Sequence, residues 1–173
     1  AGFGQHSGLG SQQTDRGADQ GCRSLSDFVA PQATGLADHI GAFAVTTGHG
    51  DEEALAKHIA STDDYGRIML KALADRLAEA FAESLHARVR RSLRGSANAE
   101  RLTNDEMSAG KYHGIRPAPG CPGQPDHTEK ATIFKLLDAE KATGITLTES
   151  YAMWPGAAVS GLYFSHPDSH YFG

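Results

Sequence analysis

A proline-rich stretch between residues 113 and 127 constrains the fold of this chain more than any other feature. Four of the seven prolines fall within it, at positions 117, 119, 122 and 125, with glycines at 114, 120 and 123. Proline restricts φ to about −65°, lacks an N–H, and pushes the preceding residue out of the helical region. The stretch therefore predicts a stiff loop that is neither helix nor central strand. Arg116 stands at its start, and a guanidinium is a natural bidentate partner for a carboxylate or a phosphate.

Length and charge limit the classes of protein to which the chain can belong. Its 173 residues suit one domain with a real core, and its net charge of −5 argues against a general affinity for nucleic acid or anionic membranes. No apolar run is long enough to cross a bilayer and no signal peptide is visible, which favours the cytoplasm. Cys22 and Cys121 lack the spacing of a disulfide framework or of a cysteine-based zinc site.

The residue pattern predicts an α+β fold with a mostly antiparallel sheet. Residues 1–24 are rich in glycine and poor in apolar side chains, so we expect a loose segment there. Short strands are predicted at 28–29, 40–47, 145–148 and 157–164. Helices are predicted at 51–61, from Asp63 to a stop at Gly95-Ser96, from the capping box at Thr103 to Gly110, and from Asp126 or Thr128 to about Ala142, before Gly144.

The long central helix carries an unusual apolar pattern. An apolar side chain recurs every fourth residue, and a strict period of four drifts around a helix of 3.6 residues per turn. This winding stripe and the many alanines beside it predict contacts with more than one neighbour. The stripe consists of Met69, Leu73, Leu77, Phe81, Leu85 and Val89.

Several long motifs, taken in order, resemble one family. The chain reads Gly114-Ile-Arg-Pro-Ala-Pro-Gly120, then Pro125-Asp-His-Thr-Glu-Lys130, then Leu147-Thr-Glu-Ser-Tyr-Ala-Met-Trp-Pro155 and Val159-Ser-Gly-Leu-Tyr-Phe-Ser-His-Pro167. From about Ser24 to Gly173 it resembles the activation domain of cobalamin-dependent methionine synthase. The resemblance implies a twisted antiparallel sheet with helices packed around it. It also implies that residues 25–173 are an activation domain truncated at both ends relative to the family.

The resemblance further implies an activity that the chain shares with other domains. It implies a module of a methyltransferase that binds S-adenosylmethionine and supports reductive methylation of cob(II)alamin in methionine biosynthesis. Cobalamin would be held by a neighbouring domain of the same enzyme, and a flavodoxin or flavoprotein reductase would supply the electron. The family's cobalamin-binding motif and catalytic zinc site do not occur in these residues, so the chain alone should have no turnover.

The same resemblance assigns ligand contacts around the proline loop. Arg116 would grip the ligand's carboxylate, and backbone groups of Pro117, Ala118 and Gly120 would bond the adenine edge and the ribose. The aromatic pair Tyr171 and Phe172 would close over the ligand.

Acidic residues on the helices have two interpretations. Asp75 and Glu79 lie four residues apart on one helix face and could form a solvated surface paired with Lys71 or Arg76. The resemblance instead implies that Glu79 contacts the ligand and that Asp75 and Asp51 contact the cobalamin domain. Asp51 replaces a glutamate that is usual in the family.

Departures from the family pattern favour a second function. Cys121 stands where the motif Arg-x-x-x-Gly-Tyr ends in tyrosine, which removes an aromatic wall of the ligand pocket, and Ser84, Leu93 and Ser96 replace further aromatics. The alternative is therefore a non-catalytic docking domain that keeps the fold but has lost the ligand. A methyltransferase with a glycine-rich cofactor loop, and a metal site at His166 and His170, are less favoured, because no strand leads into a glycine-rich helix start and Pro167 interrupts the histidine pair.

Overall fold

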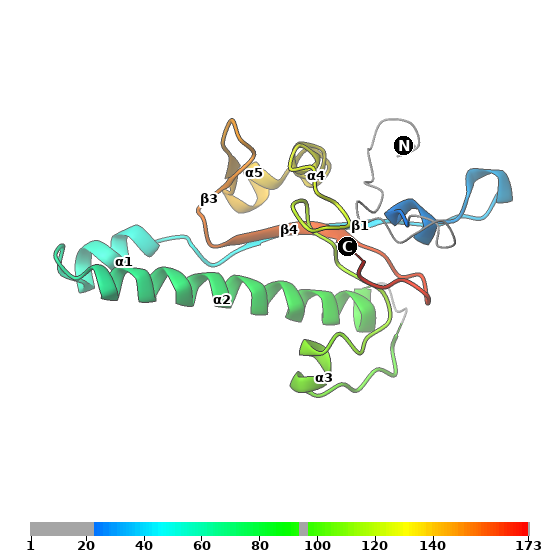
Figure 1. Ribbon diagram of the computed structural model, residues 1–173, viewed down its shortest axis with the longest axis horizontal. Coiled ribbons are helices and arrows are strands. Elements are labelled where there is room, and N and C mark those ends of the chain that lie inside the picture. The colour runs from blue at the N-terminus through cyan, green and yellow to red at the C-terminus, as the bar shows by residue number, and fades with distance from the viewer. Residues whose placement is uncertain (1–22, 94–96, 173) are drawn as a thin grey trace, which may run out of the picture.

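An antiparallel pair of strands forms the centre of the computed structural model, which describes residues 23–93 and 97–172. Strand β1 (Gly41–Thr46) pairs with β4 (Ala158–Tyr163), so that Phe43 lies opposite Gly161. A second, shorter antiparallel pair joins β2 (Thr146–Leu147) to β3 (Met153–Trp154). Helix α2 (Asp64–Arg88) runs along one face of β1 and β4, while α4 (Glu129–Leu137) and α5 (Ala139–Thr143) lie on the other (Figure 1). The predicted α+β architecture is confirmed.

Side chains that alternate along the two central strands build one core on each face. Phe43, Val45 and Tyr163 pack with Ala82 under α2. On the opposite face, Leu162 and Phe164 join a cluster with Leu25, Phe28, Ile115 and Ile133. The second cluster brings the N-terminal segment, the proline loop and α4 together at one end of β4.

Helix α2 begins as predicted, and part of its apolar stripe stays exposed. The carboxylate of Asp63 caps it by accepting the N–H of Gly66 at 2.8 Å. The helix faces the strands with alanines, of which Ala78 and Ala82 are 1% and 0% exposed. The helix contacts α1 as well as β1 and β4, so it has more than one neighbour, as predicted. Four members of the apolar stripe nevertheless remain about half exposed; these four are Met69, Leu73, Leu77 and Phe81.

The C-terminal end of α2 continues into a π-helical turn, η3 (Val89–Leu93). The predicted helix stop at Gly95-Ser96 lies outside the described residues, which omit 94–96. No helix in the described part of the chain is long and apolar enough to span a membrane.

The strand predicted at residues 28–29 is wrong. Leu25–Phe28 forms a 3₁₀ helix, η1, whose capping box pairs Ser24 with Asp27. The side chain of Asp27 accepts the N–H of Ser24 at 2.9 Å. Because residues three apart align on a 3₁₀ helix, Leu25 and Phe28 enter the core together. A second short 3₁₀ helix, η2, spans Gln32–Thr34.

Other predicted helices are present with altered bounds. Helix α1 (Asp51–His58) is shorter than expected, because Ile59 turns to an extended conformation. Helix α3 (Asn104–Ser108) has the predicted capping box between Thr103 and Glu106. The helix predicted to reach Ala142 is broken at Asp138, which adopts φ 49° and separates α4 from α5.

Candidate functional site

The start of the proline loop is fastened to the free edge of β4. Ile115 exchanges two backbone hydrogen bonds with Phe164, at 2.9 and 3.0 Å, and the carbonyl of Pro117 accepts the N–H of Leu162 at 3.0 Å. Gly114 enters this segment with φ +90°, and a Cβ there would collide with the carbonyl of Phe164. Residues 115–117 therefore extend the sheet by one short edge segment, which fixes the position of Arg116.

The rest of the loop is held by backbone hydrogen bonds between its own residues, which agrees with the predicted stiffness. The N–H of Cys121 donates to the carbonyl of Ala118 at 3.0 Å, and the N–H of Gly120 donates to the carbonyl of Gln124 at 2.8 Å. Several backbone groups expected to bind a ligand are thus already engaged. In the described part of the chain, the N–H of Ala118 and the carbonyl of Gly120 form no hydrogen bond, so these two groups can serve a ligand.

A buried lysine anchors the far end of the loop. Lys130 is 7% exposed, and its Nζ lies 3.1 Å from His127 Nδ1 and donates to the carbonyl of Tyr151 at 3.0 Å. Burial lowers the pKa of Lys130. The imidazole of His127 packs against Gly120, where a Cβ would come within 2.5 Å of the ring. His127 therefore supports the loop from below.

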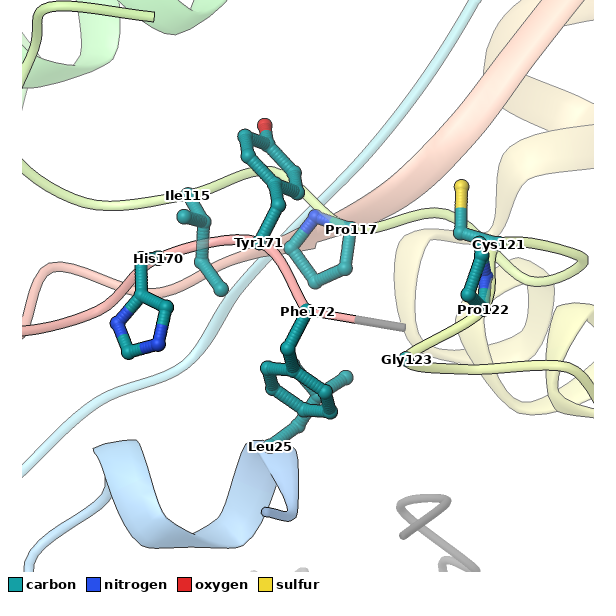
Figure 2. A pocket seen from close by; sticks show the side chains of 9 residues that line it. All are labelled: Leu25, Ile115, Pro117, Cys121, Pro122, Gly123, His170, Tyr171 and Phe172. Atoms are coloured by element: carbon teal, nitrogen blue, oxygen red, sulfur yellow. The ribbon is translucent and has the colours of Figure 1, made fainter. Parts of the chain in front are cut away.

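An apolar pocket of about 380 Å³ opens between the loop and the C-terminal segment (Figure 2). Tyr171 and Phe172 point to opposite sides of that segment, with the Phe172 ring directed toward Leu25 (Figure 2). Neither Ala118 nor Gly120 is among the lining residues. The lining consists of Leu25, Ile115, Pro117, Cys121, Pro122, Gly123, His170, Tyr171 and Phe172.

Arg116 is not among the lining residues, although its neighbours Ile115 and Pro117 are. Its backbone N–H donates to the hydroxyl of Tyr171 at 3.0 Å, and its Nη1 donates to the hydroxyl of Tyr112 at 3.2 Å. The side chain is half-buried and forms no ion pair with any described residue. A half-buried guanidinium without a carboxylate partner can receive an anionic group from a ligand.

One flank of α2 lies near Arg116. Glu79, Glu83, His86 and Arg90 are spaced by three or four residues and share this flank. Burial, together with the positive charges of Arg90 and Arg116, lowers the pKa of His86 to about 3. The imidazole is therefore neutral at physiological pH.

Aromatic and ionic contacts connect this flank to the loop. The ring of His86 meets Tyr112 edge-on at 4.9 Å, and Arg90 Cζ lies 4.3 Å from the Tyr112 ring centre. Arg90 is held by Glu100 at 2.8 Å in an ion pair whose side chains are 5% and 9% exposed. Sequence reasoning missed Tyr112, His86 and Arg90. The helical spacing from Glu79 to Arg90, with Tyr112 four residues before Arg116, was the available signal.

None of the predicted acidic residues Asp51, Asp75 and Glu79 is among the residues that line the pocket. Glu79 is exposed and precedes His86 by seven residues, which is about 10 Å along the helix axis. Asp75 lies one turn further away and is also exposed, and Asp51 begins α1, where it accepts the N–H of Glu52 at 2.7 Å. Asp75 and Glu79 are both exposed, as the solvated surface predicted, whereas Lys71 pairs with Glu52 at 3.0 Å and not with either of them.

Comparisons with known proteins agree on one family. The family model of the vitamin B12 dependent methionine synthase activation domain matches residues 6–173. A crystal structure of the MetH reactivation domain bound to AdoHcy superposes with a TM-score of 0.84 at 56% identity. That match covers 94% of this chain and 50% of the other, so this chain spans half the length of the solved one. The chain therefore belongs to the family of activation domains of vitamin B12 dependent methionine synthases.

Proposed function

We propose that this chain holds S-adenosylmethionine beside Arg116, for the reactivation of a cobalamin-dependent methionine synthase. The observation that carries the proposal is the half-buried guanidinium of Arg116, which has no ion pair with a described residue and whose chain neighbours Ile115 and Pro117 line an apolar pocket. The similar reactivation domain, at 56% identity, was solved with S-adenosylhomocysteine, the demethylated form of the same molecule.

Groups of the proline loop and of the nearby pocket suit the parts of such a ligand. The Arg116 guanidinium can take the carboxylate bidentately, and the open N–H of Ala118 and carbonyl of Gly120 can serve the adenine edge. Pro117, Tyr171 and Phe172 supply apolar wall. The cavity volume of about 380 Å³ falls in the range of small-molecule sites. Glu79 is assigned to the ligand from the exposed part of the same α2 flank.

The chain's own contribution is to bind and orient the methyl donor. S-adenosylmethionine supplies the methyl group for reductive methylation of cob(II)alamin on a neighbouring domain, with an electron from a flavodoxin or flavoprotein reductase. Positioning two reactants can lower a barrier by several kcal/mol, on the order of 7 or more in favourable cases. Asp75 and Asp51 are assigned to the contact with the cobalamin domain. The free, exposed thiol of Cys121 is consistent with a cytoplasmic location.

One observation favours the alternative of a docking domain without ligand. Cys121 is exposed on the pocket wall, at the position where the family motif ends in tyrosine. An aromatic face stacked on adenine contributes about 1 to 3 kcal/mol, and a thiol cannot replace it. The fold is kept in either case, so only binding measurements separate the two functions.

Calorimetric titration with S-adenosylmethionine tests the proposal. We expect saturable binding by the wild-type protein and a loss of at least about tenfold in affinity for Arg116→Ala, since hydrogen bonds to charged groups contribute about 1.5–3 kcal/mol each. Arg88→Ala is the matched control, because Arg88 is an exposed arginine of α2. Equal effects of the two substitutions would contradict the role of Arg116.

The substitution Cys121→Tyr separates the proposal from its alternative. Restoring the aromatic ring should tighten S-adenosylmethionine binding by about tenfold or less, for about 1 kcal/mol of stacking. If neither the wild-type protein nor Cys121→Tyr binds, the docking-domain function is the better description.

A further inference from the structure

Tyr112 is held rigidly by residues that do not line the pocket. Its ring is half-buried, edge-on to His86 at 4.9 Å and 4.3 Å from Arg90 Cζ. Arg90 is in turn fixed by a buried ion pair with Glu100, which binds both Nε and Nη2. Because a guanidinium attracts the face of an aromatic ring, the helix end and Glu100 together set where the Tyr112 ring lies.

The Tyr112 hydroxyl meets two groups assigned to the ligand. It accepts a hydrogen bond from Arg116 Nη1 at 3.2 Å and lies 3.3 Å from the Tyr171 hydroxyl. The Tyr171 hydroxyl also accepts the backbone N–H of Arg116 at 3.0 Å. Tyr112, Tyr171 and Arg116 thus form a closed set of three hydrogen bonds, and of these residues only Tyr171 lines the pocket.

One of the two phenolic protons of Tyr112 and Tyr171 has no acceptor within this set. Each tyrosine hydroxyl has one proton to donate and two lone pairs to accept with. The bond between the two hydroxyls uses one proton, whichever oxygen donates it, and both bonds from Arg116 use lone pairs. The second proton has no acceptor within this set. Burial raises the pKa of Tyr112 above its usual range, so that its phenol stays protonated at physiological pH.

We propose that Tyr112 is a positioning residue that orients the Arg116 guanidinium and the Tyr171 hydroxyl toward the carboxylate end of the ligand. The inference rests on the proposed function. The guanidinium keeps its Nη2 and its remaining protons for the carboxylate while Nη1 is tied to the phenol. Tyr112 itself is absent from the pocket lining, so it acts through its two partners.

Two ligands that differ at one end test this role. S-adenosylhomocysteine carries the amino-acid end, and 5′-methylthioadenosine has the same adenosine and thioether without it. In calorimetry, Tyr112→Phe should weaken S-adenosylhomocysteine by about tenfold and change 5′-methylthioadenosine by less than about twofold. Tyr65→Phe is the matched control, because Tyr65 is 74% exposed at the start of α2. It should leave both affinities unchanged.

The possible outcomes distinguish the positioning role of Tyr112 from the proposed function on which it rests. If Tyr112→Phe weakens both ligands equally, its effect is general to the fold, and the positioning role is overturned. The role is also overturned if the wild-type protein binds both ligands and Tyr112→Phe changes neither. A wild-type protein that binds neither ligand overturns the proposed function, and this inference with it. Urea unfolding of Tyr112→Phe confirms that the variant is folded before it is titrated.

Discussion

The two flanks of α2 present opposite chemistry on one helix. Leu77 and Glu79 each lie about 100° around the axis from the buried Ala78, on opposite sides. On the Glu79 side the residues become more buried toward the C-terminal end, where His86 and Arg90 are 2% and 4% exposed. On the Leu77 side the apolar side chains of Met69, Leu73, Leu77 and Phe81 stay about half exposed.

This difference shows that burial on α2 follows contacts more closely than hydrophobicity. On the polar flank Arg90 pairs with Glu100, and the His86 ring stacks on Tyr163 and meets Tyr112 edge-on. Among the described residues, His86 Nδ1 and Glu83 Oε1 are nevertheless buried without a hydrogen-bond partner. A row of alanines between the flanks lets the helix approach the strands closely. The site at Arg116 is therefore supported by a polar layer, and the apolar stripe plays no part in it.

Breaking the ion pair of the polar flank should have the largest effect on stability. Glu100→Gln keeps the shape of the side chain but leaves Arg90 buried without a countercharge. We expect a loss of about 3 kcal/mol or more in the free energy of unfolding, measured by urea denaturation. Glu53→Gln, at an exposed glutamate of α1, is the control and should cost little. A small loss for Glu100→Gln would mean that water reaches this layer.

Enlarging the alanine row should cost somewhat less. Ala78→Leu places three extra carbons at a side chain that is 1% exposed, where α2 meets β1 and β4. Overpacking of this kind costs about 1–3 kcal/mol. Ala80→Leu adds the same atoms on the exposed side of the same helix and should be close to neutral. Equal effects in thermal or urea unfolding would show that the two sides of α2 are not distinct.

The neutral imidazole of His86 should make stability depend on pH. In the unfolded chain it binds a proton as pH falls through its ordinary pKa of about 6.5, whereas the folded protein holds that pKa at about 3. Stability is therefore lost as pH falls from about 6.5 towards 3, with a slope of at most about 1.4 kcal/mol per pH unit. His86→Phe keeps a ring against Tyr163 and should flatten the curve in this window. An unchanged slope in urea unfolding between pH 4 and 6.5 would contradict the assignment.

The sequence carried local signals better than partnerships between distant segments. The Thr103 capping box, the Asp63 cap and the strand at 40–47 were predictable, because each depends on neighbouring residues. The proline loop was recognised as stiff, but its attachment to Phe164 depends on residues 49 positions apart and leaves no local pattern. The ion pair between Arg90 and Glu100 was not predicted either, because the sequence showed Arg90 only as part of a basic helix end and gave no sign that it is buried. The strand predicted at 28–29 failed because the Ser24 cap outweighed β-propensity.

Polar substitutions on the apolar flank should have the smallest effect and test the comparison most directly. Leu73 and Leu77 are 56% and 52% exposed, so Leu73→Gln and Leu77→Gln should each change the free energy of unfolding by no more than about 0.5 kcal/mol. Leu55→Gln is the positive control, because Leu55 is 1% exposed and a buried amide without partners is strongly destabilising.

A double variant at 73 and 77 that loses more than about 2 kcal/mol would mean that this flank is covered in solution. Repeating the denaturation at several protein concentrations then identifies the cover: a loss that grows with concentration points to a second copy, and a constant loss points to the chain's own residues. A second copy would make the apolar stripe a contact between molecules. Cover by the chain's own residues would mean that both flanks of α2 are buried and differ only in whether their side chains are polar or apolar.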